Sequence, residues 1–216
     1  MSAEENQSVQ FPVGVLISGR GSNFIRIHQA QLAGRIAGHI ACVISSRPDA
    51  EGLAYAREHG IPSYVLPAEV MRREDAFAET LIGWLQQHHV QLVVLAGFLK
   101  KIPDAAVQAY AGRMINIHPA LLPAFGGKGM YGRRVHEAVL DYGCKVSGAT
   151  VHIVTAEYDA GPPVLQKCVP VLEDDTPDTL ARRVLEVEHE LLPHAVDLFA
   201  RGLVEVRGRR VVIRQA

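Results

Sequence analysis

Short apolar runs rich in β-branched residues alternate along the chain with longer stretches that mix apolar and polar residues. Residues 13–17, 39–44, 62–66, 91–96 and 114–118 form such runs. A run of this length without polar alternation is typical of a strand buried on both faces, as in a parallel sheet. The pattern therefore predicts five strands up to residue 118, most of them parallel.

The clearest helix is predicted over residues 72–89. Phe77, Leu81, Trp84 and Leu85 recur there at i, i+4, i+7 and i+8, which places them on one stripe of a helix. Strands that alternate with helices favour right-handed βαβ units and an α/β fold with a single doubly wound, mostly parallel sheet. Such a sheet binds ligands beyond the carboxyl ends of its strands, and we expect the functional site there.

The second half of the chain changes character after residue 118. Residues 119–132 are rich in proline and glycine and predict a long loop, followed by a helix over about 133–141. Two further strands are predicted over 148–154 and 164–171, and the short turn between them indicates antiparallel additions to the sheet.

The last elements are a helix and a hairpin. Thr176 as N-cap and Pro177 at the first helical position predict where the helix begins, and Pro193 is expected to end or kink it. Residues 204–213 predict a small hairpin around Gly208, within a terminal hairpin segment of 202–216. With no repeat or linker in between, residues 1–216 are expected to form one domain with a flexible segment at 1–11.

Composition and charge narrow the classes of function. The 216 residues are 48% hydrophobic, and 22 basic against 23 acidic residues give a net charge of −1. This excludes a disordered chain and provides no overall basic field for nucleic acid or anionic lipid. The three cysteines have no CxxC spacing, so neither a disulfide framework nor a zinc site is indicated. The polar first ten residues and the absence of a long apolar run predict a cytoplasmic location.

A glycine-rich segment, Ser18-Gly19-Arg20-Gly21-Ser22-Asn23, follows the first strand directly and opens a predicted helix. Glycines let a backbone approach an anion, and the free N–H groups at a helix N-terminus favour negative charge. Phe24 replaces the third glycine of a dinucleotide fingerprint, so a sugar phosphate or mononucleotide is favoured over NAD. A plain turn in which Ser22 caps the helix stays open as an alternative.

A second candidate lies at the end of the fifth strand. Asn116 and His118 are two residues apart, so both side chains should project to the same side of the sheet. Strand pairing in the second half could bring Asp159 within reach of His118, where a carboxylate would raise the histidine pKa and suit a general acid. A buried Asn–His pair satisfied by backbone, and an Asx turn at Asp159, are the alternatives without chemistry.

The ordered segments 15–23, 93–98, 116–123 and 159–162 together resemble the formyltransferase family that uses 10-formyltetrahydrofolate, over about residues 12–201. The resemblance implies transfer of a formyl group from that co-substrate to the amine of glycinamide ribonucleotide in purine biosynthesis. It implies two small-molecule substrates, without a metal, a nucleic acid or a membrane as partner. The oligomeric state is left open.

The family also implies roles for individual residues. Asn116, protonated His118 and Asp159 match the catalytic trio. The residues that match ribonucleotide contacts are Arg20, Gly21, Ser22, Asn23, Leu185, Glu186, Val187 and Glu188. Those that match folate contacts are Arg73, Leu99, Lys100, Lys101, Ile102, Asn116, Thr155, Ala156, Glu157, Tyr158 and Asp159. The loop over 125–134 is longer and richer in glycine than the short family version, so no contact is carried over to it.

Several rival functions share part of these motifs. Methionyl-tRNA formyltransferase and formyltetrahydrofolate hydrolase have the same catalytic residues, but each is expected to need a further domain that 216 residues would not hold. An NAD-dependent oxidoreductase or nucleotide-binding module has only the glycine turn in its favour. A protein that binds formyl-folate without turnover is a third class.

Overall fold

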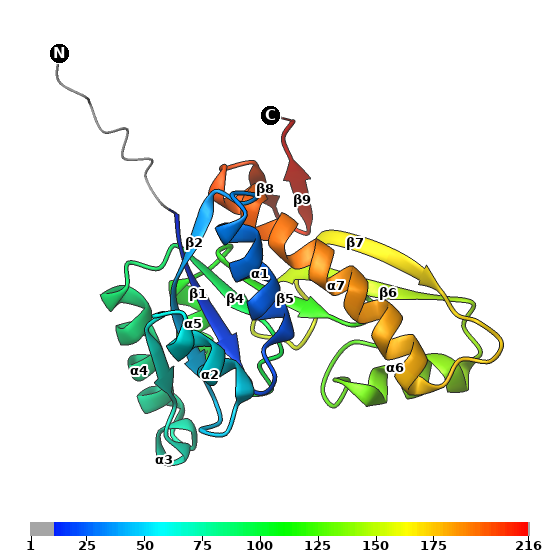
Figure 1. Cartoon of the computed structure of the whole chain (residues 1–216), viewed down its shortest axis with the longest axis horizontal. Coiled ribbons are helices and arrows are strands. Elements are labelled where there is room, and N and C mark those ends of the chain that lie inside the picture. Colours follow the sequence, from blue (N-terminus) through cyan, green and yellow to red (C-terminus); the bar gives the residue numbers. More distant parts are fainter. Residues whose placement is uncertain (1–10, 216) are drawn as a thin grey trace.

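The computed structural model describes residues 11–215, which fold around a seven-stranded sheet with the strand order β3-β2-β1-β4-β5-β6-β7 (Figure 1). The strands are β1 (Phe11–Ile17), β2 (Gly38–Ser45), β3 (Ser63–Val65), β4 (Leu92–Leu95), β5 (Met114–His118), β6 (Val146–Ile153) and β7 (Pro163–Pro170). β1 to β5 are parallel, and β6 and β7 are antiparallel additions. The predicted fold class is confirmed. The flexible segment expected at 1–11 lies outside the described residues except for Phe11, which begins β1.

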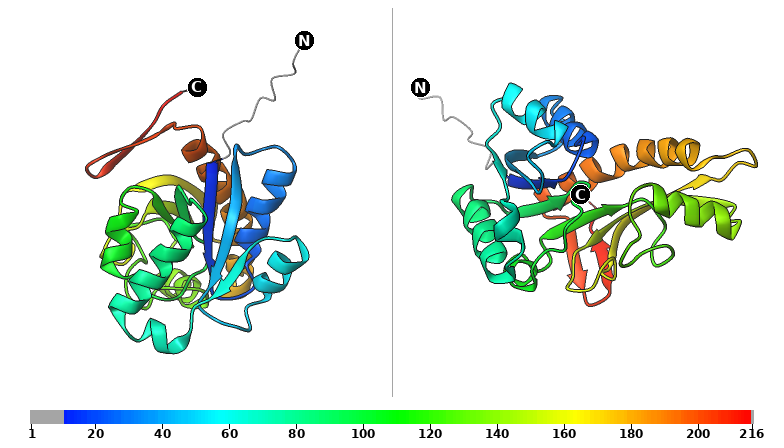
Figure 2. Two further views of the ribbon diagram at one scale, coloured as in Figure 1. Left: turned by 90° about the vertical axis from the view of Figure 1, so that its left-hand side faces the viewer. Right: turned by 90° about the horizontal axis from the view of Figure 1, so that it is seen from below.

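Helices cover both faces of this sheet, as the side views show (Figure 2). The helices are α1 (Ser22–Leu32), α2 (Glu51–Glu58), α3 (Ala68–Met71), α4 (Glu74–Gln87), α5 (Asp104–Ala109), α6 (Arg133–Tyr142) and α7 (Pro177–Ala200). Val15 and Ile17 of β1 pack with α1, α2 and α7, whereas Leu16 packs with α4 and α5. Because its alternate side chains enter two cores, β1 has the continuous apolar run from which it was predicted.

The predicted helix over 72–89 is α4, which begins two residues later because the backbone of Arg73 is extended. Phe77, Leu81 and Leu85 are buried as the stripe requires. Trp84 lies at the edge of the stripe and stacks on Tyr64, with ring centroids 4.8 Å apart. The short helix α3 before it was not predicted.

The last helix, α7, begins as predicted but does not end at Pro193. Thr176 accepts a hydrogen bond from the Thr179 N–H, and Pro177 is the first helical residue. The helix continues to Ala200 with Pro193 buried within it. Burial of the flanking turns against the core compensates for the hydrogen bond that proline cannot donate.

The chain closes with the predicted hairpin, made of β8 (Val204–Arg207) and β9 (Arg210–Ile213) around Gly208. Gly208 has a φ of 58°, a left-handed conformation that favours glycine. Within residues 11–215, no helix is both long enough and apolar enough to span a membrane.

Candidate active site

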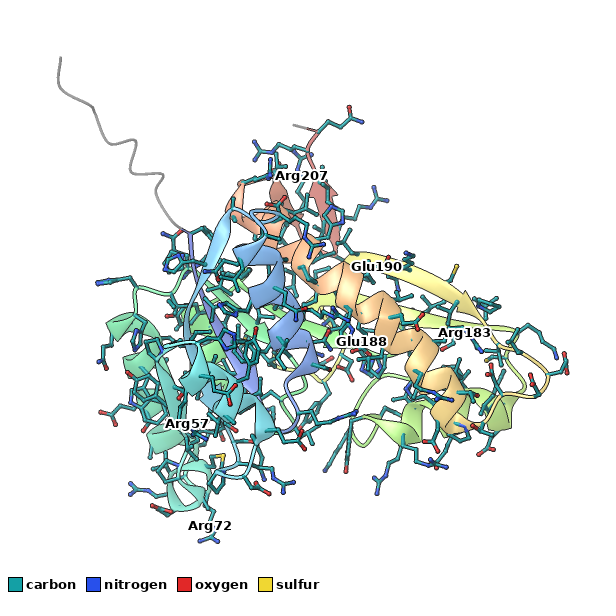
Figure 3. All side chains as sticks on the ribbon, viewed as in Figure 1. Arg57, Arg72, Arg183, Glu188, Glu190 and Arg207 are labelled. Atoms are coloured by element: carbon teal, nitrogen blue, oxygen red, sulfur yellow. The ribbon has the colours of Figure 1, made fainter. Side chains whose placement is uncertain are left out.

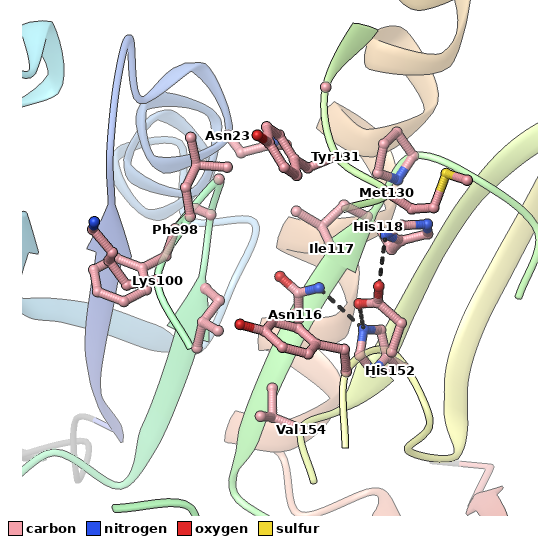
Figure 4. Close-up of a pocket in the computed structure, with 18 of the residues that line it drawn as sticks. Asn23, Phe98, Lys100, Asn116, Ile117, His118, Met130, Tyr131, His152 and Val154 are labelled. Atoms are coloured by element: carbon pink, nitrogen blue, oxygen red, sulfur yellow. Dashed lines mark hydrogen bonds and ion pairs between the residues drawn. The ribbon is translucent and has the colours of Figure 1, made fainter. Parts of the chain in front are cut away.

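A cavity of about 370 Å³ lies beyond the carboxyl ends of β1, β4 and β5, where a doubly wound sheet is expected to bind ligands (Figure 4). Segments that are far apart in the chain line it. They are residues 19–23, 95–102, 116–119, 127, 129–132, 152, 154–159, 185 and 188. The glycine-rich segment and the predicted catalytic residues therefore share one cavity.

The glycine-rich segment presents the bare N-terminus of α1 to this cavity. Gly21 is the N-cap, with a left-handed φ of 72° and no side-chain cap, and Ser22 is the first helical residue. The alternative in which Ser22 caps the helix is therefore wrong. A Cβ atom at position 21 would lie 3.1 Å from the Gly52 Cα, so the close approach of two loops also requires glycine here. Uncapped N–H groups at a helix N-terminus form an anion site.

Asn23 of α1 and Glu188 of α7, which is labelled in Figure 3, both line the cavity and contact each other. The Asn23 Nδ2 donates a hydrogen bond of 2.6 Å to the Glu188 Oε2. Burial raises the pKa of Glu188 to about 7, although the bond from Asn23 acts in the opposite direction. Among the described atoms, the buried Asn23 Oδ1 has no hydrogen-bond partner. The pair thus offers acceptors to a donor that enters the cavity.

The other predicted residues of α7 face different surroundings. Leu185 lines the cavity together with Glu188, one helical turn away. Val187 is buried in the core between α7 and the sheet. Glu186 lines a separate groove, together with Arg26 and His189. Of the four residues predicted here, only Leu185 and Glu188 therefore line the cavity.

Asn116 at the end of β5 is oriented by His152, which the sequence did not single out. The β5–β6 register sets the two residues opposite each other. The His152 Nδ1 lies 2.9 Å from the Ile153 carbonyl oxygen and donates to it, so Nε2 accepts from the Asn116 Nδ2 at 3.0 Å. This bond orients the Asn116 amide and leaves its second N–H free to donate.

Asp159 lies over the end of β5, within reach of His118 as predicted. Its Oδ2 is 3.6 Å from the His118 Nδ1, and its Oδ1 is 3.5 Å from the His152 Nε2 (Figure 4). Burial acts to raise the pKa of Asp159. Hydrogen bonding from His152 and the charge of His118, each when its ring is protonated, together with the Gly127 N–H bond of 2.9 Å outweigh that effect and hold the pKa below its usual value. Asp159 is therefore a carboxylate at neutral pH.

His118 is 3% exposed, and its two ring nitrogens face two acceptors. The Nε2–H donates to the Phe125 carbonyl at 2.9 Å, and Nδ1 faces Asp159. The expectation of a raised pKa is wrong, because desolvation lowers the pKa of His118 more than Asp159 and the Phe125 carbonyl raise it. The neutral ring carries its proton on Nε2, and a second proton on Nδ1 would form an ion pair with Asp159.

Two segments form the opposite part of the cavity wall. Leu99, Lys100, Lys101 and Ile102 follow β4, and residues 155–159 form the turn between β6 and β7; all of them line the cavity. The side chains of Leu99 and Tyr158 are 57% and 47% exposed, so they offer apolar surface at the rim. Arg73 caps α4 and is not among the lining residues.

The glycine-rich loop supplies lining residues that the sequence did not identify. Met130 and Tyr131 face the cavity, and the Arg134 guanidinium lies 5.3 Å from the centre of the Tyr131 ring. A Cβ atom at Gly126 would lie 3.1 Å from the Asp159 Cβ, so this loop also packs against the catalytic candidates. The long glycine-rich stretch was the only signal in the sequence.

The arrangement can stabilise negative charge and move a proton. Asn116 has a free N–H, His118 can carry one or two protons, and an ionised Asp159 stands beside it. Donors at the wall of one cavity suit the tetrahedral oxyanion of an acyl transfer, provided that the His118 Nε2–H leaves the Phe125 carbonyl. Among residues 11–215, no three His, Cys, Asp or Glu side chains lie close enough together to hold a metal ion.

The fold and these residues are those of a formyl transferase. The chain belongs to the formyl transferase family, whose model matches residues 12–196. It is 45% identical over 185 residues to the chloroplastic phosphoribosylglycinamide formyltransferase of Arabidopsis thaliana; this covers 85% of the chain and 63% of that relative, which is therefore considerably longer. It is 38% identical to the phosphoribosylglycinamide formyltransferase of Escherichia coli strain K12, covering 89% of the chain and 88% of the relative. The crystal structure of glycinamide ribonucleotide transformylase 1 from Symbiobacterium toebii matches with a TM-score of 0.91 and 42% identity, covering 99% and 100% of the two chains.

Proposed function

We propose that the chain is a phosphoribosylglycinamide formyltransferase. It would transfer the formyl group of 10-formyltetrahydrofolate to the amine of glycinamide ribonucleotide, giving formylglycinamide ribonucleotide and tetrahydrofolate in purine biosynthesis. One observation carries the proposal: a bare helix N-terminus suited to a phosphate and the Asn116–His118–Asp159 group open into the same cavity. The names of relatives in three organisms support transfer of a formyl group to this acceptor.

The ribonucleotide would extend from the N-terminus of α1 towards β5. Its phosphate would bind at Arg20, Gly21, Ser22 and Asn23, where backbone N–H groups and the helix dipole favour an anion. Leu185 and Glu188 would contact the ribose and the glycinamide, with the Glu188 carboxylate as partner of the amine. Glu186 and Val187 face away from the cavity, and we assign them no contact.

The folate would bind between the segment after β4 and the turn at 155–159. Backbone groups of Leu99 to Ile102 would meet the pterin, and the turn would close over it. Arg73 stands outside the cavity lining, so we assign it to the glutamate end of the folate, which would project towards α4. Residues 11–215 would act as one domain in the cytoplasm on these two small molecules.

The reaction would need no covalent intermediate with the protein. The amine attacks the formyl carbon, a C–N bond forms, and the carbonyl electron pair moves to the oxygen. The Asn116 N–H and the His118 Nε2–H, released from the Phe125 carbonyl, donate to that oxyanion. His118 takes up the proton that the amine loses on Nδ1, beside Asp159, and its Nε2 proton passes to the folate nitrogen as the bond from carbon to that nitrogen breaks. Asp159 stabilises the imidazolium while it exists.

A single assay tests this function against its rivals. The absorbance of a 10-formylated folate analogue is followed with and without glycinamide ribonucleotide. We expect deformylation only when the ribonucleotide is present, with one formylglycinamide ribonucleotide formed per folate consumed. Deformylation without the acceptor would indicate a hydrolase instead. Binding of both ligands without any turnover would indicate a protein that binds formyl-folate but does not catalyse transfer.

We expect Glu188→Gln to weaken binding of the ribonucleotide while it stabilises the folded protein at pH 8. The variant keeps an acceptor for Asn23 but loses the charge, so ribonucleotide binding at pH 8 should weaken by about 10- to 100-fold, as for loss of a charged hydrogen bond. Because the pKa of Glu188 is raised to about 7, the stability that its protonated form contributes is present at low pH and lost as the pH rises through 7. The variant should therefore have a higher Tm than the wild type at pH 8, and the difference should shrink towards pH 5.

Calorimetric titration with glycinamide ribonucleotide and thermal unfolding at the two pH values measure both effects. Glu190→Gln is the matched control, because Glu190 is an exposed carboxylate on the same helix, paired with Lys167 and outside the cavity (Figure 3). Equal pH dependence of binding in the Glu188→Gln variant and the wild type would contradict the assignment of the amine to Glu188.

A further inference from the structure

The proposed reaction leaves a buried serine without a role. Ser18 is the first residue after β1, and its side chain is at the centre of a short chain of hydrogen bonds. Its Oγ accepts the Leu99 N–H at 2.9 Å and lies 2.6 Å from the Ser46 Oγ. Leu99 follows β4 and Ser46 follows β2, so one hydroxyl joins the ends of three adjacent strands.

The position of Ser18 links the two proposed ligand sites. It lies two residues before Arg20, where the segment proposed to bind the phosphate begins, and it accepts the backbone N–H of Leu99, where the proposed folate wall begins. The backbone around it is fixed as well, because the Ser46 N–H donates to the Ile17 carbonyl at 3.1 Å. The Ser18 side chain is thus a direct hydrogen-bonded link between the segment after β1 and the segment after β4.

The hydrogen bonding of Ser18 leaves little freedom for an alternative arrangement. A hydroxyl has one proton, so Ser18 accepts from Leu99 and can donate to Ser46, and bonds in such a chain strengthen one another in a buried setting. The Leu99 side chain is 57% exposed, so packing anchors it little and the N–H bond holds this backbone. Without the Ser18 hydroxyl, the Leu99 N–H would lose this partner.

We propose that Ser18 is a positioning residue through which binding of the ribonucleotide and binding of the folate favour each other. A phosphate seated on residues 20–23 fixes the conformation of Ser18, and the Ser18–Leu99 bond then holds the folate wall in its binding conformation. By linkage the folate must favour the ribonucleotide by the same factor. The identity of the two ligands rests on the function proposed above.

The test compares Ser18→Ala with Ser45→Ala. Ser45 is also a buried serine at the end of β2, but among residues 11–215 its hydroxyl is hydrogen-bonded to Arg47 alone and not to Leu99. Tetrahydrofolate and glycinamide ribonucleotide cannot react with each other, because no formyl group is present. Calorimetry can therefore measure the Kd of tetrahydrofolate with and without saturating ribonucleotide in each protein.

We expect the ribonucleotide to tighten tetrahydrofolate binding by about fivefold or more in the wild type and in Ser45→Ala, as is typical of coupled sites. In Ser18→Ala this ratio should fall to about one, with KM for the folate raised more than kcat is lowered. A ratio of one in the wild type, an unchanged ratio in Ser18→Ala, or an equal loss in Ser45→Ala would overturn the proposal. Failure of the wild type to bind either ligand would overturn the proposed function together with it.

Hydrogen exchange of the wild-type protein provides a second measurement if Ser18→Ala does not fold. Ribonucleotide alone should slow exchange of the Leu99 amide, although Leu99 lies in the folate wall. Slowed exchange of this amide supports the proposal, because Ser18 is its hydrogen-bond partner. An unchanged exchange rate on saturation with the ribonucleotide contradicts it.

Discussion

Replacing His118 with alanine is expected to lower kcat by about 10²- to 10³-fold, which is the usual cost of losing one donor to an oxyanion. The Kd values of both substrates should change much less, because the ring is 3% exposed and its contacts are with Phe125 and Asp159. Single-turnover kinetics with saturating substrates measures the chemical step directly. Loss of turnover together with retained binding would assign His118 to the transition state.

The same variant permits a rescue experiment. Removal of the buried ring leaves a cavity next to Asp159, and added imidazole should restore part of the lost rate. His194→Ala is the control, because His194 is an exposed histidine on α7 outside the cavity. Wild-type turnover in His118→Ala would show that this side chain is not required. Thermal unfolding of each variant separates a loss of chemistry from a loss of fold.

The sheet could be predicted because its strands are buried on both faces. Val15 and Leu16 enter opposite cores, so β1 appears in the sequence as an unbroken apolar run. Helix boundaries were predicted less well than strands. α4 begins two residues later than predicted, and α7 continues past Pro193 to Ala200. Thr176 sets the start of α7 through a local side-chain cap, whereas Pro193 lies within a helix that packing on the sheet maintains.

The sequence could predict which site residues lie close together only where those residues belong to one strand or one turn. Asn116 and His118 lie together because side chains two residues apart in a strand share a face. His152 contacts Asn116 through the register of an antiparallel pair, which depends on the packing of the whole sheet rather than on nearby residues. The Phe125 carbonyl that binds His118 belongs to a long loop whose course no local pattern specifies.

Burial accounts for the one chemical expectation that was wrong. Asp159 lies within reach of His118, and its charge raises the histidine pKa as expected. The sequence does not show that the ring is almost completely desolvated, which lowers the pKa by a larger amount. His118 is therefore neutral in the free protein and becomes protonated as the reaction proceeds. Asp159 therefore does not keep His118 protonated in the free protein. It stabilises the imidazolium that forms during the reaction.

Asp159→Asn tests that role, and we expect it to lower kcat by about 10²-fold, within the range for a group that acts in proton transfer. The amide can still accept the Gly127 N–H, so the turn should keep its position and substrate binding should be largely kept. The sign of the pH effect follows from the charge. Asp159 raises the pKa of His118, so removing the carboxylate lets burial lower that pKa further. Any part of the kcat profile that requires imidazolium should move to lower pH.

Two measurements distinguish a specific effect of Asp159 on His118 from the general effect of removing one negative charge. The dependence of kcat on pH is compared in the wild type, Asp159→Asn and Asp141→Asn, which removes an exposed carboxylate of α6 away from the cavity. NMR titration of the His118 ring then tests whether its pKa falls in Asp159→Asn and stays constant in Asp141→Asn. If the kcat profile stays in place while the His118 pKa falls, the imidazolium is not the form that reacts. In that case the neutral ring must donate from Nε2, and Asp159 would act on orientation alone.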